Sequence, residues 1–587
     1  INVPFDKNAV GVRVVAKAGN FTDGEQISLP ILSNKTRITS AFPIMLNKVG
    51  DQIIDYTSIL PKGEVSQLKV TLDYVQNPLW QVLMAMPDVN VKEETQTVQL
   101  ANKLVALAAV DQILKNNPGI RNVLNEWKKV GADAMASELE KNPELKAIVL
   151  AETPWVVKAQ SQEQRKRYLA ELLTAVDAQV EGKAIWQKLA QGISFEDSRK
   201  GWPWCFGMNA NVGISRAILT NLDRMKQING SFYESIVDSK LVDEVMQYVV
   251  ANKWKYYLSL KEDQKPKIDD VQLVWLMERN KGDFSKYKVM IAALDKNALS
   301  EWNKRGLNEQ ITVAKIAEAM GKSSTRTEIV SSLKQRAIAT ADRGTFWPAY
   351  QTAQGTNVGN VATQAAVIEL FANQSDTKEL VKQAQVWLLL NKRSNDWGDN
   401  YSTTEAIYGL LKATDWSTTA ITDVIKQNGS TISIPKLEAG SGYLNVYLNN
   451  AMRQVSIKKG NINPSFGTIY AQYLIDVDKV ETVQTGLKIS KTLYTVSKDA
   501  KGKDVKTKVV EGASIKQGQK VYVELKLEVD QAMEYLQIKD YRAAGLDPVE
   551  QNTSYVYENG LSAYKQVKDA TVTYSIDRVE RGVYLIG

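Results

Sequence analysis

The apolar residues of this 587-residue chain change their spacing twice along the sequence. Up to about residue 76 they alternate with polar residues, as Leu68, Val70 and Leu72 do, which is typical of a strand with one buried face. From Asn77 onward the spacing becomes three to four residues, which predicts helices. After Trp416 the alternation returns and continues to the C-terminus. The sequence therefore predicts two β regions separated by one long helical block.

The helical block, residues 77–415, holds roughly twelve to fourteen predicted helices joined by short turns. Many helices with short connections pack as antiparallel pairs, in either a closed α/α toroid or an open solenoid. No fixed repeat length stands out in the sequence, and this favours the closed toroid.

Neither flanking β region offers alone the roughly seven strands that a closed β-sandwich needs. Residues 34–76 and 416–482 together can supply them. The simplest prediction is a β-sandwich into which the whole helical domain is inserted. A separate C-terminal β-sandwich then follows at residues 483–587.

The composition excludes several classes of protein. Hydrophobic residues make up 44% of the chain and charged residues 24%, which is ordinary for a soluble globular protein. No uncharged apolar stretch approaches the about 18–20 residues that cross a bilayer, so we expect no membrane span. The net charge of +7 arises from 73 basic and 66 acidic residues that alternate almost everywhere. Nucleic-acid binding needs basic residues gathered on one face, so we expect no nucleic-acid partner.

The chain contains no histidine and one cysteine. The absence of histidine excludes Ser-His-Asp and Cys-His catalysis and histidine-ligated zinc. A single cysteine cannot form an internal disulfide or a thiolate metal cluster. The sequence also lacks a P-loop, a glycine-rich dinucleotide loop and an acidic calcium loop, so it predicts no metal and no cofactor.

Cys205 and two pairs of carboxylates are the remaining candidates for covalent or acid–base chemistry. Cys205 stands between two aromatic residues in a chain without a histidine base, which favours its interpretation as a small buried hydrophobe. Two carboxylates can divide the acid and base roles of glycoside cleavage, and the candidate pairs are Glu196 with Asp197 and Asp396 with Asp399. Acids in polar turns more often serve as caps, which is the competing interpretation.

Four tryptophans stand near predicted helix starts or turns of the helical block, namely Trp202, Trp204, Trp347 and Trp397. In a toroid such residues either form an aromatic surface that binds sugars or fill the central core. Aromatic residues most often take the second role, and we therefore favour the core.

A series of short sequence strings runs in a fixed order over essentially the whole chain. They are Asp23-Gly-Glu-Gln26, Leu29-Pro-Ile-Leu32, Asn77-Pro-Leu-Trp80, Met86-Pro87, Leu150-Ala-Glu-Thr-Pro-Trp155, Gly201-Trp-Pro-Trp204, Thr363-Gln-Ala365, Trp387–Trp397, Ser402–Tyr408, Phe466-Gly467, Gln472-Tyr473, Met533-Glu-Tyr535, Lys539–Arg542, Pro548-Val549, Asn559-Gly560 and Asp577-Arg578. In this order they resemble the bacterial α2-macroglobulin family. Each string alone is weak, whereas the ordered set is specific.

The resemblance implies the C-terminal part of a larger envelope protein. Its domains would be the end of a macroglobulin-like β-sandwich (1–33), the first half of a CUB-type β-sandwich (34–76), a thioester-type α/α toroid (77–415), the second CUB-type half (416–482) and a receptor-binding-like β-sandwich (483–587). It further implies a location in the bacterial periplasm or at the outer membrane, with any lipid anchor outside these residues.

The resemblance also implies a function, that of a broad-spectrum peptidase trap. In this family a protease cuts a bait segment, the molecule rearranges and the protease is caged. Many members in addition bind the protease covalently through a Cys-x-x-Gln thioester. The implied partners are proteases and the other domains of the same larger chain.

The thioester motif is degenerate in this chain. The segment that follows Met86-Pro87 contains Glu93, Glu94, Thr95 and Gln96. Gln96 could occupy the glutamine position, but Glu93 stands where the thiol is required, and a carboxylate cannot form the thioester. We therefore expect a non-catalytic endopeptidase inhibitor that traps proteases without a covalent bond.

Two functions from other classes stay open. An envelope adhesion or scaffold module that has lost trapping would bind a partner without any bait cleavage. A carbohydrate-active α/α toroid enzyme would need two carboxylates that face one cleft among the tryptophans.

Overall fold

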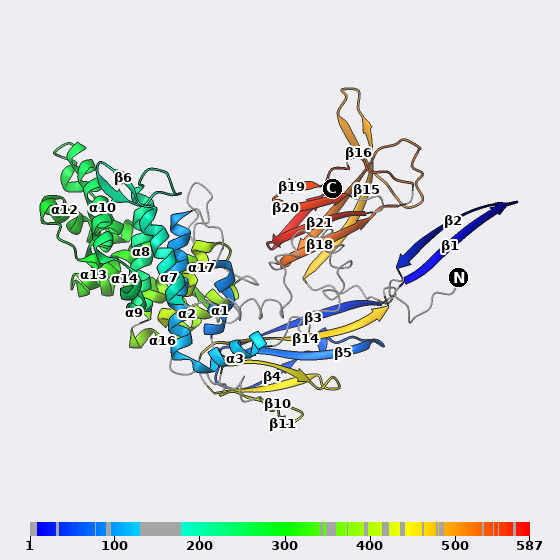
Figure 1. Ribbon diagram of the computed structural model, residues 1–587, viewed down its shortest axis with the longest axis horizontal. Coiled ribbons are helices and arrows are strands. Elements are labelled where there is room, and N and C mark those ends of the chain that lie inside the picture. The colour runs from blue at the N-terminus through cyan, green and yellow to red at the C-terminus, as the bar shows by residue number, and fades with distance from the viewer. Residues whose placement is uncertain are drawn as a thin grey trace. The chain divides into compact units, whose positions relative to one another are not determined.

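The computed structural model forms two compact units, one made of Ile1–Lys128 with Leu169–Val480 and a second that includes Glu481–Gly587. Both are drawn in Figure 1. The structure describes residues 9–30, 35–76, 78–89, 96–129, 178–340, 344–347, 360–372, 374–392, 397–413, 422–434, 441–460, 463–476, 479, 486–530, 533–543, 545–549, 551–567 and 571–587. The apolar spacing also predicts helices at about 143–150 and 163–180; the first and all but the last residues of the second lie outside the described residues.

Alternating valines build the first hairpin. Strand β1 (Ala9–Ala18) pairs antiparallel with β2 (Phe21–Pro30) in a sheet of their own. Gly19 lies in the turn with φ of +60°, a conformation that glycine adopts readily because it has no Cβ.

Two four-stranded sheets form the β-sandwich of the first unit, with strand orders β12-β5-β14-β3 and β11-β10-β13-β4. The strands are β3 (Lys35–Leu46), β4 (Gly50–Asp55), β5 (Ser66–Val75), β10 (Val424–Gln427), β11 (Ser430–Thr431), β12 (Tyr443–Leu448), β13 (Gln454–Lys459) and β14 (Ser465–Asp476). Each sheet combines strands from before and after the helical block. The predicted insertion of that block into a β-sandwich is thereby confirmed.

The strand register follows the apolar alternation of the sequence. Leu72 of β5 lies opposite Val446 of β12 on one side and opposite Ile469 of β14 on the other. Leu72 and Ile469 are fully buried, and they share one hydrophobic core with Ile54 and Ile457 of the second sheet. The polar residues between them face away, which is the arrangement that a half-buried antiparallel sheet requires.

Fourteen α-helices are described between the two halves of the sandwich. They are α1 (Leu79–Val89), α2 (Thr97–Asn116), α3 (Pro118–Lys129), α7 (Ala178–Gln191), α8 (Val212–Ile228), α9 (Gly230–Ile236), α10 (Ser239–Ser259), α11 (Val271–Asn280), α12 (Lys288–Leu299), α13 (Leu307–Ala319), α14 (Ser323–Arg336), α15 (Asn360–Phe371), α16 (Lys378–Leu390) and α17 (Asn400–Ala413). Two hairpins that the sequence did not predict lie among them, β6 (Ser194–Glu196) with β7 (Arg199–Gly201) and β8 (Ile338–Thr340) with β9 (Gly344–Phe346). A strand of three residues is too short to show a recognisable alternation of apolar and polar residues.

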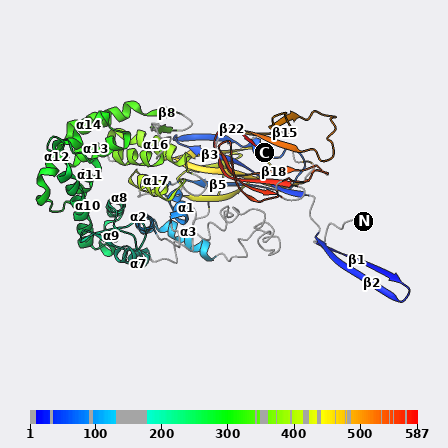
Figure 2. The ribbon, with the colours of Figure 1, turned by 90° about the horizontal axis from the view of Figure 1, so that it is seen from above.

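Six of these helices close a ring. In order around the ring, α2 packs against α8, α8 against α11, α11 against α13, α13 against α15, α15 against α17, and α17 again against α2. A second layer covers them, since α7 packs on α2, α10 on α8, α12 on α11, α14 on α13, α16 on α15 and α1 on α17. Figure 2 shows these helices from above. The helical domain is therefore the predicted closed α/α toroid.

Helix α2 shows the residue pattern that a helix of the inner ring needs. Ala101, Val105 and Ala108 are buried together with Leu100 and Leu104, so more than one face of the helix is buried. A helix that is buried around most of its circumference needs apolar residues on all sides. Alanine also lets neighbouring helices approach closely.

The second unit is a β-sandwich of two four-stranded sheets, β16-β15-β17-β22 and β18-β21-β20-β19. Its strands are β15 (Leu487–Lys498), β16 (Asp504–Lys508), β17 (Val521–Val529), β18 (Met533–Tyr541), β19 (Ser554–Glu558), β20 (Leu561–Val567), β21 (Thr571–Val579) and β22 (Gly582–Ile586). Leu525, Leu527, Ile538 and Ile576 belong to the core between the two sheets.

Gln76 joins the two ends of the helical insertion by hydrogen bonds. Its side-chain oxygen accepts hydrogen bonds from the backbone N–H groups of Thr422 (2.8 Å) and Asp423 (3.2 Å), which lie after the helices in the sequence. Asp423 in turn accepts a hydrogen bond of 2.5 Å from the hydroxyl of Tyr74 on β5. Gln76, Tyr74 and Asp423 are all buried. Buried hydrogen bonds therefore join the two chain segments between which the helical domain is inserted. Among the described residues, no helix combines the length and apolar character needed to cross a membrane.

Candidate functional site

The segment predicted at the thioester position ends at Gln96, where the first inner helix begins. Glu93, Glu94 and Thr95 lie outside the described residues, and Gln96 is the N-cap residue of α2. Gln96 forms an isolated antiparallel bridge with Cys205, the only cysteine of the chain. Next to the bridge, the N–H of Thr97 donates to the carbonyl of Trp204 at 3.0 Å. The loop that carries Cys205 is therefore fixed to the start of α2, a proximity that no spacing in the sequence indicates.

Three of the four tryptophans are core residues. The alternative that they form an aromatic, sugar-binding surface of the toroid is therefore wrong for these three. Trp202, Trp347 and Trp397 are exposed by at most 4%. Their indole N–H groups donate to main-chain carbonyls of Leu189 (3.0 Å), Leu333 (2.8 Å) and Leu388 (2.7 Å), in that order.

These three hydrogen bonds follow one pattern. The accepting leucines lie towards the C-terminal ends of α7, α14 and α16. Each tryptophan comes after the helix whose carbonyl it binds and before the next inner helix. Burial of a large apolar ring with its N–H satisfied explains why tryptophan stands at these positions. Trp204 differs, with 57% of its surface exposed.

The candidate acid–base pairs do not form a catalytic constellation in the described residues. The carboxylate of Glu196 accepts a hydrogen bond of 2.6 Å from Tyr248, and exposed Asp197 forms an ion pair with Lys255 at 2.9 Å. The hydrogen bond and charge of Lys255 lower the pKa of Asp197, whereas a general acid needs a raised pKa. Asp399 accepts hydrogen bonds from the backbone and the hydroxyl of Ser402 and so caps α17. Asp396 lies outside the described residues.

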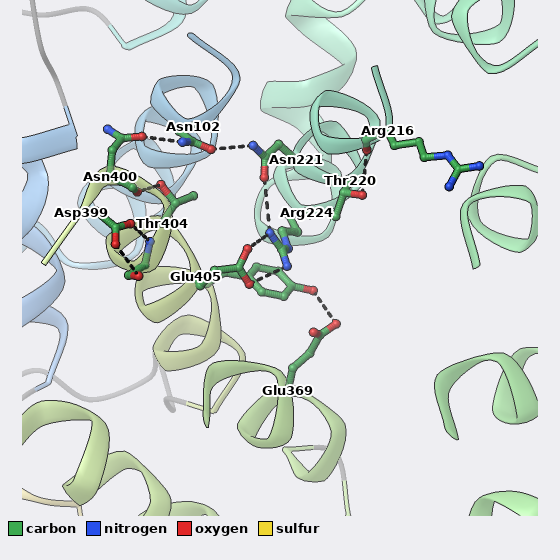
Figure 3. A network of polar contacts seen from close by, with 12 residues as sticks. Asn102, Arg216, Thr220, Asn221, Arg224, Glu369, Asp399, Asn400, Thr404 and Glu405 are labelled. Atoms are coloured by element: carbon green, nitrogen blue, oxygen red, sulfur yellow. Dashed lines mark hydrogen bonds and ion pairs between the residues drawn. The ribbon is translucent and has the colours of Figure 1, made fainter. Parts of the chain in front are cut away.

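A chain of polar side chains, several of them buried, joins helices of the inner ring (Figure 3). Asn102 of α2 donates to Asn400 of α17 and accepts a hydrogen bond of 2.6 Å from Asn221 of α8. Arg224, one turn further along α8, forms a bidentate ion pair with Glu405 of α17, with one N–O distance of 2.6 Å. These contacts join three inner helices through their side chains.

Glu369 of α15 extends this network to the other side of the ring. Its carboxylate pairs with Lys315 of α13 and accepts a hydrogen bond of 3.0 Å from the hydroxyl of Tyr408 on α17. Burial works to raise the pKa of Glu369, but the charges of Lys315 and Arg224 outweigh it, so the pKa is lowered. Burial raises the pKa of Tyr408 well above its ordinary value. At neutral pH Glu369 is thus ionised and Tyr408 protonated.

This network is suited to holding helices in place and not to catalysis. Its ionic groups are paired, and the pKa shifts of Glu369, Tyr408 and Arg224 move each group away from a proton exchange near pH 7. Buried ion pairs are costly to desolvate, and removal of one partner from such a pair is strongly destabilising. In the part of the chain that the structure describes, no cluster of Cys, Asp and Glu residues could hold a metal ion.

Sequence reasoning missed Arg224, Glu369 and Glu405. A signal was available for Glu369, which interrupts the apolar stretch Ala365–Phe371, whereas Arg224 and Glu405 follow polar residues and give no such signal. Charged residues are rarely buried unless they are paired, so an isolated charge on a buried face predicts a partner on another helix. The identity of that partner requires the fold.

Comparison with known proteins identifies the C-terminal domain. Residues 486–586 match the family model of the bacterial alpha-2-macroglobulin MG10 domain. None of the curated proteins matches the chain. The matched residues cover all eight strands of the second unit.

Solved structures of bacterial alpha-2-macroglobulins are similar to nearly the whole chain at low identity. The Salmonella protein reacted with methylamine is 10% identical, with 98% of this chain and 33% of that chain covered and a TM-score of 0.37. The Escherichia coli protein activated by porcine elastase is 11% identical, with 96% and 44% covered and a TM-score of 0.39. A native Escherichia coli structure from domain MG7 to the C-terminus is 11% identical, with 99% and 82% covered and a TM-score of 0.36.

The chain thus spans about a third of the length of the Salmonella protein. The finding that concerns family is the match of residues 486–586 to the MG10 family model. In these residues the chain is similar to the MG10 domain of bacterial alpha-2-macroglobulins.

Proposed function

We propose that the chain is the C-terminal part of a broad-spectrum peptidase inhibitor that holds proteases by shape and without a covalent bond. The match of residues 486–586 to the MG10 domain of bacterial alpha-2-macroglobulins is the observation that supports this most. The trapping activity would belong to the larger molecule, in which the bait segment and further domains complete the cage. We further propose a location in the bacterial cell envelope, either periplasmic or attached to the outer membrane.

The sequence at the thioester position supports non-covalent capture. A thioester needs a cysteine three residues before the glutamine, and Glu93 stands three residues before Gln96. The chain's only thiol, Cys205, belongs to a different segment and is free. Its proximity to Gln96 makes the state of this thiol a necessary control in any test of capture.

The partnered charges of the ring support a function without catalysis. Glu405, Glu369 and Asp270, three carboxylates of the toroid with little exposure, are each paired with a cation on a neighbouring helix. Hydrogen bonds and charge from Arg216, together with Lys253, lower the pKa of Asp270 although burial works to raise it. The toroid would then act as a rigid part of the cage.

Mixing the whole natural protein with porcine pancreatic elastase tests this proposal. A trapped protease should lose activity towards a large substrate such as azocasein and keep activity towards a small peptide anilide. Because no bond forms, denaturing electrophoresis should separate the protein from elastase, and a Cys205→Ser variant should trap equally well. Methylamine treatment should change nothing.

Two outcomes would contradict the proposal. Unchanged hydrolysis of azocasein would remove the inhibitor function and favour the scaffold alternative. A protease conjugate that survives denaturation and disappears in the Cys205→Ser variant would show that capture is covalent.

A further inference from the structure

A pocket of about 400 Å³ opens at the end of helix α7. One wall is apolar and is built by Phe206 and Met208, which belong to the loop between β7 and α8, together with Ile193. The lining also contains the polar residues Lys188, Gln191 and Ser194. The volume lies near the lower end of the roughly 300–1,000 Å³ that is typical of ligand sites.

The loop that carries the apolar wall is held firmly in place. Trp202 is the first residue of this loop and is fully buried. Its carbonyl accepts a hydrogen bond of 3.0 Å from the N–H of Asn211. Asn211 also caps α8 with its side chain. On the other side, the hydroxyl of Thr97 donates to the carbonyl of Pro203 at 2.5 Å. The apolar side chains beyond these anchors are therefore presented on a fixed backbone.

Further large apolar side chains are exposed close by in the sequence. Phe206 and Met208 are 40% and 53% exposed, Trp204 on the same loop is 57% exposed, and Phe195 of β6 is 60% exposed. Exposed apolar patches on a protein surface are typical of binding sites. A ligand that covers them must be longer than the pocket itself.

Two features indicate an extended peptide with an acidic group. Strand β6 pairs with β7 on one edge, and within the described residues no strand pairs with its other edge. Ser194, the first residue of β6, lines the pocket, so the strand and the pocket adjoin each other. Addition of an extended peptide to a free strand edge is a common mode of peptide recognition. Lys188 is the only charged residue in the lining, and it makes no ion pair in the described part of the chain. Its free cation complements a carboxylate.

We propose that this pocket binds an extended peptide segment that carries a bulky apolar side chain next to an acidic one. The apolar side chain fills the space between Phe206 and Met208, the carboxylate pairs with Lys188, and the peptide backbone extends the β6–β7 sheet by one strand. This site is independent of protease trapping, and its failure would leave the proposed function untouched.

Anisotropy of a fluorescein-labelled octapeptide, Ser-Thr-Val-Leu-Asp-Val-Thr-Gly, measures this binding on the full chain. We expect saturable binding that weakens at least tenfold in Lys188→Glu and in Met208→Ser. A peptide with lysine in place of aspartate should show the reverse preference and bind Lys188→Glu more tightly than the unchanged protein. Lys183→Glu, an exposed change on the same helix outside the pocket lining, serves as the matched control and should leave binding unchanged.

Three results would overturn the proposal. The first is no saturable binding of the octapeptide up to millimolar concentration. The second is an equal loss in Lys183→Glu and Lys188→Glu, which would show unspecific attraction by basic residues. The third is a Met208→Ser variant that changes the sedimentation of the chain from dimer to monomer, because the surface would then cover a second copy.

Discussion

Gln96 and Cys205 lie opposite each other in an isolated antiparallel bridge at the start of helix α2. Residues that pair in this way carry their side chains on the same side of the pair, with Cβ atoms about 4.5–5.5 Å apart. The sequence places Cys205 far from Gln96 and gives it Met208, and not glutamine, three residues later. Folding thus brings Gln96 and Cys205 together, although their separation in the sequence does not match the Cys-x-x-Gln motif.

We expect the thiol of Cys205 to be free in the purified protein. The intact mass should equal the mass of the sequence, and one thiol per chain should react with Ellman's reagent, before and after treatment with methylamine. Formation of a thioester with Gln96 would instead release ammonia, lower the mass accordingly and hide the thiol until methylamine opens the bond. That result would reverse the proposal of non-covalent capture.

The buried tryptophans give the second prediction. Replacing Trp202 or Trp347 by phenylalanine keeps most of the apolar volume but leaves the carbonyl of Leu189 or Leu333 without its indole donor. An unsatisfied buried acceptor costs about 1–3 kcal/mol, so the free energy of unfolding of the helical domain should fall by this amount. Urea denaturation followed by far-ultraviolet circular dichroism measures it.

The matched control for this prediction is Trp204→Phe. Trp204 is more than half exposed, and no indole hydrogen bond is described for it, so its replacement should change the free energy of unfolding by less than about 0.5 kcal/mol. Equal losses at Trp202 and Trp204 would show that ring size, and not the indole hydrogen bond, determines the effect.

The sequence predicted the architecture well and the site poorly, for physical reasons. Apolar periodicity is a local property, so it could reveal the strands that contain Leu72 and Ile469 and the helices between them. The ring closure through α2 and α17 was inferred only from the absence of a repeat. Partners such as Arg224 and Glu405 are set by helix packing across the ring, which no local pattern encodes.

The ion pair between Arg224 and Glu405 supplies the third prediction. Changing Arg224 to methionine leaves the carboxylate of Glu405 buried without its cation, which should destabilise the helical domain by about 3–5 kcal/mol. Glu301→Gln is the control, since its ion pair with Lys304 is exposed and should contribute less than about 1 kcal/mol. Guanidinium denaturation at pH 7 compares the two. Similar small losses in both variants would mean that water reaches the ring axis.

Close packing between two inner helices gives the fourth prediction. A Cβ atom on Gly409 of α17 would lie 2.9 Å from the Cα of Ala365 on α15, and this contact involves backbone that cannot move freely. Gly409→Ala should therefore cost about 1–3 kcal/mol despite the better helix propensity of alanine. Gly230→Ala, at the first position of α9, meets nothing within 4 Å and should be nearly neutral. A stabilised Gly409→Ala variant, measured by thermal unfolding, would show that α15 and α17 can separate.

The last prediction concerns Lys459, a fully buried lysine of strand β13. Its ammonium group donates to the hydroxyl of Ser465 at 2.6 Å. Burial lowers the pKa of Lys459 to about 8, the negative charge of Asp423 opposes this shift, and the positive charge of Lys382 on α16 adds to it. The pKa of Lys459 in the sandwich thus depends on the charge of Lys382 in the helical domain.

The sign of the pH dependence follows from the lowered pKa. Below pH 8 Lys459 is protonated in the folded and the unfolded chain, and the cost of burying its charge is present in full. Between pH 8 and about 10.5 the unfolded chain binds more protons than the folded one, so the free energy of unfolding rises with pH. Each unit of difference in pKa corresponds to about 1.4 kcal/mol, which gives a rise of roughly 2–3 kcal/mol across this window.

Urea denaturation at pH 7 and at pH 9.5 measures this effect in the unchanged protein and in Lys459→Met. The variant should be more stable at pH 7 and should lose the rise, whereas Lys458→Met, an exposed neighbour on β13, should keep it. Lys382→Met should shift the rise to higher pH, because it removes a positive charge that lowers the pKa of Lys459. Parallel pH profiles of the unchanged protein and Lys459→Met would show that Lys459 keeps its ordinary pKa and that its charge is hydrated in the folded state.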